Sequence, residues 1–224
     1  MTKFLPFLML IFIPGCLMGQ RTWDTIPYGP EGYKAAVEKF RQEPLVKEKI
    51  LFRGNSIIED GDWKKLLKDS TVINRGISGD ITYGILYRLD EVVRRKPTKL
   101  FLLIGINDIS KGIPDEVIME NIFSMVGRIK GGSPKTKIFI QSILPTNNSF
   151  PEFPNHKNKD EHVVTINAQL QKYGDRLGYT YVDLYSGFLD FESRLDAKYS
   201  TDGLHLNLAG YLHWVEILKS LKHL

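Results

Sequence analysis

An aspartate and a histidine lie three residues apart near the end of the chain, in the segment Y-S-T-D-G-L-H-L-N. At this spacing the carboxylate of Asp202 can bond one ring nitrogen of His205, which fixes the tautomer and leaves the other nitrogen free as a general base. A serine is a poor nucleophile on its own and needs such a base. The candidate is Ser56 in K-I-L-F-R-G-N-S-I-I, where an apolar run stops at small and polar residues and then resumes. Together these residues predict a base-assisted serine nucleophile.

The elements that must position these residues follow from apolar patterns along the chain. Short runs rich in β-branched and aromatic residues predict strands at 49–52, 71–74, 99–104, 137–143 and 180–184. Helical spacing predicts helices at 63–68, 83–95, 114–129, 163–177 and 208–221. This alternation predicts an α/β fold, a three-layer α/β/α sandwich with a five-stranded parallel sheet.

Small and polar residues follow each predicted strand, at R-G-N-S, R-G-I-S-G-D, G-I-N-D, L-P-T-N-N and Y-S-G. In a parallel sheet these exits share one edge, where ligands bind. With the flavodoxin-like strand order 2-1-3-4-5, the exits of the first and third strands flank the switch point and bring Ser56 and Asn107 together. Turn and cap chemistry explains any single exit as well, and Ser56 and Asp108 are each possible helix caps.

Four blocks of the sequence, in order, resemble those of the SGNH hydrolases, the GDSL-like esterase and lipase superfamily. They are G-N-S-I at 54–57, N-R-G-I-S-G-D at 74–80, G-I-N-D at 105–108 and D-G-L-H at 202–205. Asn55 stands where the motif that names the family has aspartate. This is a common variant that retains the serine, so the difference bears on the subfamily and not on the chemistry.

The resemblance implies a role for each matching residue. Ser56 would be the nucleophile, His205 the base and Asp202 its orienting partner. The oxyanion hole would consist of the backbone N–H groups of Ser56 and Gly79 and the side-chain amide of Asn107. Neutral, preorganised donors of this kind are what a developing oxyanion needs. The implied reaction is carboxylic ester hydrolysis through an acyl-enzyme, with no cofactor and no metal.

The resemblance also suggests classes of substrate. The blocks are similar to those of exported carbohydrate O-acetylesterases, including sialate esterases, which implies short acyl groups on a glycan or small molecule. They are similar as well to platelet-activating-factor acetylhydrolase-like and lysophospholipase-like enzymes, so a lipid ester is the alternative. The polar segment from Pro145 to His162 contains Phe150 and Phe153. That mixture suits a sugar-contacting loop and an ordinary surface loop equally.

Other classes of function are less well supported by the sequence. A nucleotide or phosphate binder could share the fold, but Glu59, Asp60 and Asp62 follow Ser56 where an anion would need hydrogen-bond donors. A non-catalytic carbohydrate-binding protein would not need all the candidate catalytic residues together. The 30 basic and 26 acidic residues are interspersed, with a formal net charge of +4, which indicates a solvated surface and no nucleic-acid partner.

Four further histidines favour solvated or packing roles, namely His156, His162, His213 and His223. Two of them lie in the polar stretch N-H-K-N-K-D-E-H, where His156, Asp160 and His162 form a weaker, alternative candidate for a metal site.

The first 19 residues have the layout of a secretory signal, with one lysine ahead of a short apolar core and small residues at its end. Export to the periplasm or the medium is therefore expected. Cys16 is the only cysteine, which excludes a disulfide within the chain. The segment I-P-G-C partly resembles a lipoprotein cleavage box, so a lipid anchor at Cys16 competes with cleavage near Gly19 or Gln20. Residues 20–48 are interpreted as a helical lead-in and 49–224 as the hydrolase domain.

Overall fold

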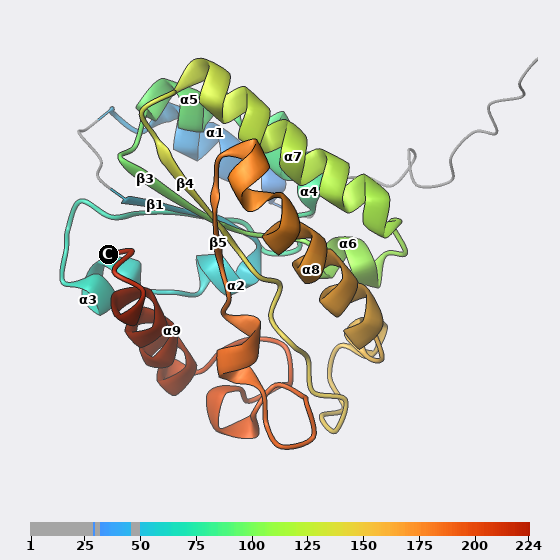
Figure 1. Ribbon diagram of the computed structural model, residues 1–224. Coiled ribbons are helices and arrows are strands. Elements are labelled where there is room, and N and C mark those ends of the chain that lie inside the picture. The colour runs from blue at the N-terminus through green and yellow to red at the C-terminus, as the bar shows by residue number, and fades with distance from the viewer. Residues whose placement is uncertain (1–28, 30–31, 46–49) are drawn as a thin grey trace, which may run out of the picture.

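A five-stranded parallel sheet forms the centre of the molecule in the computed structural model, which describes residues 29, 32–45 and 50–224 (Figure 1). The strand order is β2-β1-β3-β4-β5. The strands are β1 (Ile50–Gly54), β2 (Ile73–Gly76), β3 (Lys99–Leu103), β4 (Lys137–Gln141) and β5 (Thr180–Val182). All neighbouring strands pair in parallel. The predicted α/β fold and its flavodoxin-like strand order are confirmed.

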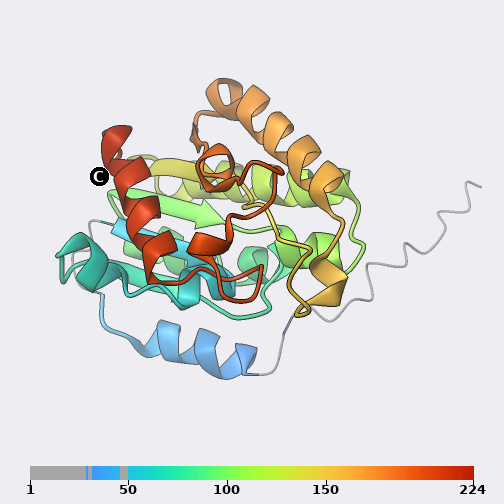
Figure 2. The same cartoon turned by 90° about the horizontal axis from the view of Figure 1, so that it is seen from below.

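The helices cover both faces of this sheet (Figure 1 and Figure 2). They are α1 (Tyr33–Gln42), α2 (Ser56–Glu59), α3 (Trp63–Leu67), α4 (Thr82–Tyr87), α5 (Asp90–Arg95), α6 (Ile106–Ser110), α7 (Asp115–Gly132), α8 (Asp160–Leu177) and α9 (Leu208–Ser220). Helices α3 and α9 pack together on one side, while α4, α5 and α8 each pack against α7 on the other (Figure 1). None of the described helices is both long and apolar enough to cross a membrane.

An aromatic row across the sheet anchors the α3 and α9 side. Phe52, Phe101 and Phe139 occupy one register position on adjacent strands, and their rings stack with centroids 4.9 and 4.6 Å apart. The indole of Trp63 stacks on Phe52 at 3.8 Å, and Trp214 of α9 meets Trp63 edge-on at 5.0 Å. These rings are almost fully buried, apart from that of Phe139, which is 6% exposed. The row thereby fixes α9 against the sheet.

Strand β1 extends two residues beyond its predicted end because a charged residue is buried on the opposite face. The guanidinium of Arg53 is fully buried and donates hydrogen bonds to the carbonyls of Ile85 (3.4 Å) and Arg88 (2.6 Å). Burial, followed by the neighbouring charge of Arg88, lowers the pKa of Arg53. Its Nη1 also lies 3.5 Å from Oε2 of Glu91, and this ion pair offsets part of the cost of burying the charge in a central strand, although Nε and Nη1 have no hydrogen-bond partner among the described residues.

The single helix predicted at 83–95 is wrong, because the chain breaks into α4 and α5 at residues 88 and 89. At the break, the buried Arg88 side chain bonds Asp80 through Nε (3.0 Å) and Nη2 (2.7 Å). It also donates to the carbonyls of Arg75 (2.9 Å) and Gly54 (3.1 Å). Two hydrogen bonds therefore connect the helix break to the ends of the first two strands, and two more connect it to Asp80 in the loop after β2.

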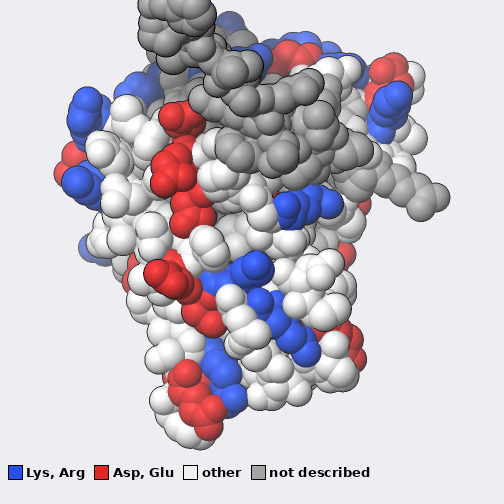
Figure 3. All heavy atoms as spheres, turned by 90° about the vertical axis from the view of Figure 1, so that its right-hand side faces the viewer, with Lys and Arg blue, Asp and Glu red and all other residues white. Residues whose placement is uncertain are grey.

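Helix α1 lies within the segment 20–48 that the sequence predicts to contain a helix. Its buried residues Tyr33 and Val37 pack with Ile77, and the Tyr33 hydroxyl donates to the carbonyl of Gly84 at 2.6 Å. The signal segment expected at 1–19, including Cys16, lies outside the described residues. On the face seen in Figure 3, basic and acidic side chains are interspersed, as expected for a solvated surface.

Candidate active site

A chain of hydrogen bonds joins the predicted serine, histidine and aspartate at the carboxyl edge of the sheet. Ser56 Oγ lies 2.9 Å from Nε2 of His205, whose Nδ1 lies 2.8 Å from Oδ2 of Asp202. The second carboxylate oxygen accepts from the backbone N–H groups of Leu204 (2.9 Å) and His205 (2.7 Å). Burial opposes ionisation of Asp202, but these hydrogen bonds hold its pKa below the usual value. The carboxylate is thus charged and orients the imidazole.

The start of α2 presents the Ser56 hydroxyl. The possibility that Ser56 caps this helix is wrong, because the cap is Asn55, whose Oδ1 accepts from the backbone N–H of Ile57 at 3.1 Å. Asn55 is fully buried, and its backbone carbonyl accepts from Ile58 (3.1 Å) and Glu59 (3.0 Å). Asparagine is a good N-cap. Because Asn55 satisfies the helix end, the hydroxyl of Ser56 is left to bond His205.

A tight turn ahead of α9 presents His205. The Ser200 hydroxyl donates to the carbonyl of His205 at 2.6 Å and accepts from the N–H of Gly203 at 2.9 Å. Gly203 has a φ of +79°, a left-handed conformation that glycine adopts without steric cost. The Tyr211 hydroxyl of α9 donates to the carbonyl of Ile57 at 2.8 Å. This hydrogen bond ties the helix behind the histidine to the helix that carries the serine.

Two predicted donors, Gly79 and Asn107, lie on the other side of Ser56. Gly79 has a φ of +74° in the loop after β2. Its neighbour Ser78 is held by Glu59, whose Oε2 accepts from the Ser78 N–H (2.7 Å) and hydroxyl (2.5 Å). Asn107 Nδ2 donates to the carbonyl of Asp80 at 3.0 Å. Asn107 lies inside α6, whose N-cap is Gly105, so its side chain does not cap that helix.

These elements enclose a cavity of about 500 Å³ that opens at Ser56. It brings together the predicted Ser56, Gly79, Asn107 and His205, with Asp202 behind the histidine. Its lining consists of Ser56, Ser78, Gly79, Asn107, Ser110, Lys111, Phe153, Pro154, Asn155, His156, Leu204 and His205. An activated hydroxyl facing two candidate oxyanion donors can attack an acyl group and stabilise the tetrahedral species that forms.

His156 is a site residue that the sequence interpretation missed. It lies in the loop between β4 and α8, which begins at Asp160. Its Nε2 is 3.0 Å from Oδ1 of Asn107. His162 instead pairs with Asp115 at 3.0 Å. Among the described residues no group of three or more histidine, cysteine or acidic side chains could hold a metal ion. The one sequence feature that could have indicated His156 as a site residue is the position of its loop, which follows a predicted strand at the ligand-binding edge of the sheet.

Asp108 is fully buried and serves a helix other than its own. Its carboxylate accepts from the backbone N–H of Thr82 (3.0 and 3.1 Å) and from the Thr82 hydroxyl (2.6 Å), at the start of α4. Asp108 therefore does not cap its own helix, α6. Its carboxylate instead satisfies the first backbone N–H of α4. Burial raises the pKa of Asp108 from 3.8 to about 7, although the bonds from Thr82 oppose the shift.

We expect Asp108 to make the folded state less stable as the pH rises from about 4 to about 7. In this window the folded carboxyl retains a proton that the unfolded chain has lost, so deprotonation favours unfolding. Asp108→Asn removes the titration. The free energy of unfolding of the wild type, relative to the variant, should fall with rising pH by up to about 1.4 kcal/mol per pH unit. Urea unfolding across this range measures the difference, and parallel curves would contradict the prediction.

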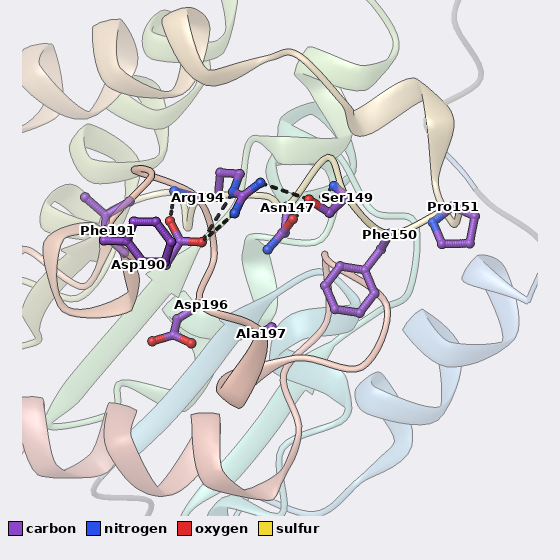
Figure 4. A pocket seen from close by; sticks show the side chains of 10 residues that line it. Asn147, Ser149, Phe150, Pro151, Asp190, Phe191, Arg194, Asp196 and Ala197 are labelled. Atoms are coloured by element: carbon purple, nitrogen blue, oxygen red, sulfur yellow. Dashed lines mark hydrogen bonds and ion pairs between the residues drawn. The ribbon is translucent and has the colours of Figure 1, made fainter.

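A second cavity, of about 610 Å³, is lined in part by residues of the segment 147–151, and none of its lining residues is a histidine (Figure 4). Its polar side chains bond one another: Arg194 bonds Asp190 at 3.2 Å and donates to Oγ of Ser149 at 2.9 Å. The Ser149 hydroxyl therefore faces a guanidinium, and the two carboxylates that line the cavity, Asp190 and Asp196, are paired with Arg194 and Lys198. This geometry favours Ser56, which lies beside His205, over Ser149 as the candidate nucleophile.

Comparisons with known proteins find related esterases. The chain is 29% identical over 149 residues to an arylesterase of Vibrio mimicus, which covers 53% of this chain and 74% of the relative. It is 26% identical over 170 residues to platelet-activating factor acetylhydrolase IB subunit alpha2 of Rattus norvegicus, covering 72% of this chain and 70% of the relative.

Solved structures that resemble this chain include proteins described as lipases of the same kind. A GDSL-like lipase from Bacteroides thetaiotaomicron superposes with a TM-score of 0.73 at 25% identity, covering 86% of this chain and 98% of the other. A Streptococcus pneumonia protein, provisionally described as a platelet activating factor, superposes with a TM-score of 0.77 at 31% identity, covering 84% and 91%. The model of the GDSL-like lipase/acylhydrolase family matches residues 54–212. The chain therefore belongs to that family, and the reaction that it catalyses is the hydrolysis of carboxylic esters.

Proposed function

We propose that the protein hydrolyses short-chain acyl esters, above all O-acetyl groups on carbohydrates, through an acyl-enzyme on Ser56. The observation that carries this proposal is the unbroken hydrogen-bond chain from Ser56 through His205 to Asp202. Ser56 Oγ attacks the acyl carbon while His205 Nε2 takes its proton. His205 then returns the proton to the leaving alcohol as the carbon–oxygen bond breaks. In the second half-reaction it activates the water that releases the acid.

In this mechanism the oxyanion is held by the N–H groups of Ser56 and Gly79 and by the amide of Asn107. An amide nitrogen carries two N–H donors. The carbonyl of Asp80 takes one from Asn107, and the other is available to the cavity that Asn107 lines. The hole therefore combines two backbone donors with one side-chain donor, all of them neutral.

We expect Asn107→Ala to lower kcat by about 10²–10³-fold with little change in KM, because the lost donor acts on charge that develops only in the transition state. Hydrolysis of p-nitrophenyl acetate and the unfolding midpoint should be measured on one preparation. Asn121→Ala is a matched control, since its amide bonds Thr82 at 2.9 Å outside the cavity. A fully active Asn107→Ala variant would remove this residue from the mechanism.

The lining of the cavity supports a carbohydrate ester. Eight of its twelve residues carry polar side chains, which suits a hydroxyl-rich substrate better than an alkyl chain. Lys111 is among them and could pair with a carboxylate. Sialic acid is a sugar that carries a carboxylate, and this supports O-acetylated sialic acid as the substrate that we propose within the class.

The alternative, a lipid ester, is favoured by one feature. A groove of about 580 Å³ includes Leu206, next to His205, and runs along α9; its lining combines four leucines and Tyr211 with the charged residues Asp60, Asp62, Lys65 and Lys68. Leu208 and Leu212 line it and are exposed by 69% and 48%. An alkyl chain could lie there. The two relatives named as platelet-activating factor proteins point to the same class of substrate.

A panel of esters decides between these substrates. We expect kcat/KM to be higher for O-acetylated sialic acid than for p-nitrophenyl esters of eight or more carbons (roughly the lipase range) or for an sn-2 acetyl phospholipid. Lys111→Met should weaken turnover of the sialic acid ester and leave that of an acetylated neutral sugar unchanged. Higher turnover of the long-chain or phospholipid ester, together with its loss in Leu212→Asp, would instead establish the lipid alternative.

A further inference from the structure

The imidazole of His156 reaches the back of the proposed oxyanion hole from the loop between β4 and α8. Its Nε2 lies 3.0 Å from Oδ1 of Asn107. The backbone around it is fixed, since the His156 N–H donates to the carbonyl of Phe153 at 2.9 Å in a short 3-10 turn. The Phe153 ring stands edge-on to both His156 (5.9 Å) and His205 (5.0 Å). The loop therefore delivers this side chain to one defined place.

The hydrogen bonds of Asn107 allow only one orientation of its amide. The carbonyl of Asp80 can only accept, so the group that faces it at 3.0 Å must be the NH₂ of Asn107. The amide oxygen then faces His156, whose Nε2 must carry the proton. Turning the amide over would place oxygen against oxygen at Asp80 and N–H against N–H at His156. His156 and Asp80 thus lock the amide from both sides.

The neutral form of His156 suits this task. Burial, followed by the charges of His205 and Lys111, lowers the pKa of His156, so it is uncharged at neutral pH. Its Nδ1 is buried and has no hydrogen-bond partner among the described residues. With one ring nitrogen unpartnered, the single proton of the neutral ring goes to Nε2, where Asn107 accepts it. A donor at Oδ1 also polarises the amide and strengthens its remaining N–H groups as donors.

We propose that His156 is a positioning residue for the oxyanion hole. It holds the Asn107 amide so that the second N–H of Nδ2 points at the acyl oxygen and not into the protein. Asn107 is only 8% exposed, so without His156 its oxygen would lose its partner and the amide could turn. The inference rests on the proposed role of Asn107 as an oxyanion donor, and it gives the loop after β4 a part in catalysis.

A double-mutant cycle between His156 and Asn107 tests the proposal. We expect His156→Phe to lower kcat for p-nitrophenyl acetate by roughly 10-fold, a fraction of the loss on removing the donor itself, with KM almost unchanged. His156→Gln retains a side-chain donor and should restore most of kcat. In the Asn107→Ala background, His156→Phe should have almost no further effect, because the group that it positions is gone.

Each other outcome has a definite meaning. A wild-type kcat for His156→Phe, or an equal fold-loss in both backgrounds, would overturn the proposal, since a purely structural role adds independently of Asn107. If His156→Phe fails to fold, as judged by its unfolding midpoint, His156→Leu and His156→Gln replace it in the same cycle. A wild-type kcat for Asn107→Ala would reject the proposed oxyanion donor itself. A slow Asn107→Ala with a fully active His156→Phe would reject only this inference.

Discussion

Replacement of Ser56 with alanine is expected to lower kcat for p-nitrophenyl acetate on the order of 10⁶-fold, and to abolish labelling by a fluorophosphonate. The hydroxyl is the proposed site of the acyl-enzyme, and it lies 2.9 Å from the base at His205. The fold should persist, because the cap of α2 is Asn55 and the backbone of Ser56 is unchanged. Steady-state hydrolysis and the unfolding midpoint are measured on the same sample.

Ser149→Ala provides the matched control, since this hydroxyl lies in the second cavity and accepts a hydrogen bond from Arg194 (Figure 4). It should hydrolyse the ester and react with the fluorophosphonate as the wild type does. Undiminished turnover by Ser56→Ala, or loss of labelling in Ser149→Ala, would move the nucleophile away from the site that we propose.

Replacement of Arg88 with methionine should destabilise the protein by about 3–5 kcal/mol. The Arg88 side chain is buried, and removing it leaves the fully buried carboxylate of Asp80 without its cation. Burial already raises the pKa of Asp80 against the opposing effect of Arg88. The variant should also lose activity, because the carbonyl of Asp80 holds the amide of Asn107. Urea unfolding measures the loss of stability. The loss of activity is measured as kcat at urea concentrations below the unfolding transition.

Arg41→Met controls for the loss of an arginine at an exposed ion pair. Arg41 lies 3.7 Å from Asp90, and the two side chains are 39% and 58% exposed. Its loss should cost about 1 kcal/mol or less, because exposed pairs contribute little. The double variant with Asp80→Asn should be more stable than Arg88→Met alone, since the buried charge is gone. Equal destabilisation by Arg41→Met and Arg88→Met would contradict this account of the buried pair.

The inner strands of the sheet were predictable because they are buried on both faces and therefore appear as near-continuous apolar runs. Leu100, Phe101 and Leu102 of β3 are all at most 2% exposed. The positions of the candidate residues followed from the same rule, because strand exits in a parallel sheet share an edge. Ser56 and Asn107 follow β1 and β3, which are neighbours in the sheet.

Features that depend on partners far away in the chain could not be predicted from the sequence. The break between α4 and α5 lies where Arg88 meets Asp80 and strand-end carbonyls, and no local propensity encodes those contacts. His156 was expected to have a solvated or packing role because polar residues surround it in the chain, yet its partner Asn107 is 49 residues away. Asn55 and Ser56 are both good caps, so propensity alone could not choose between them.

The hydrogen bond between Ser56 and His205 closes a loop of 149 residues. Contacts of such long sequence separation form late, because the entropy of closing the loop must be overcome before the contact contributes. The turn with His205 is held locally by Ser200 and Asp202, and it reaches Ser56 in the structure in which Tyr211 of α9 bonds the carbonyl of Ile57. During synthesis, a nascent chain therefore carries an unactivated serine until its last helix has been made and packed. In the mechanism that we propose, the active site is thus completed late in folding, and a chain that ends before His205 lacks the base for Ser56.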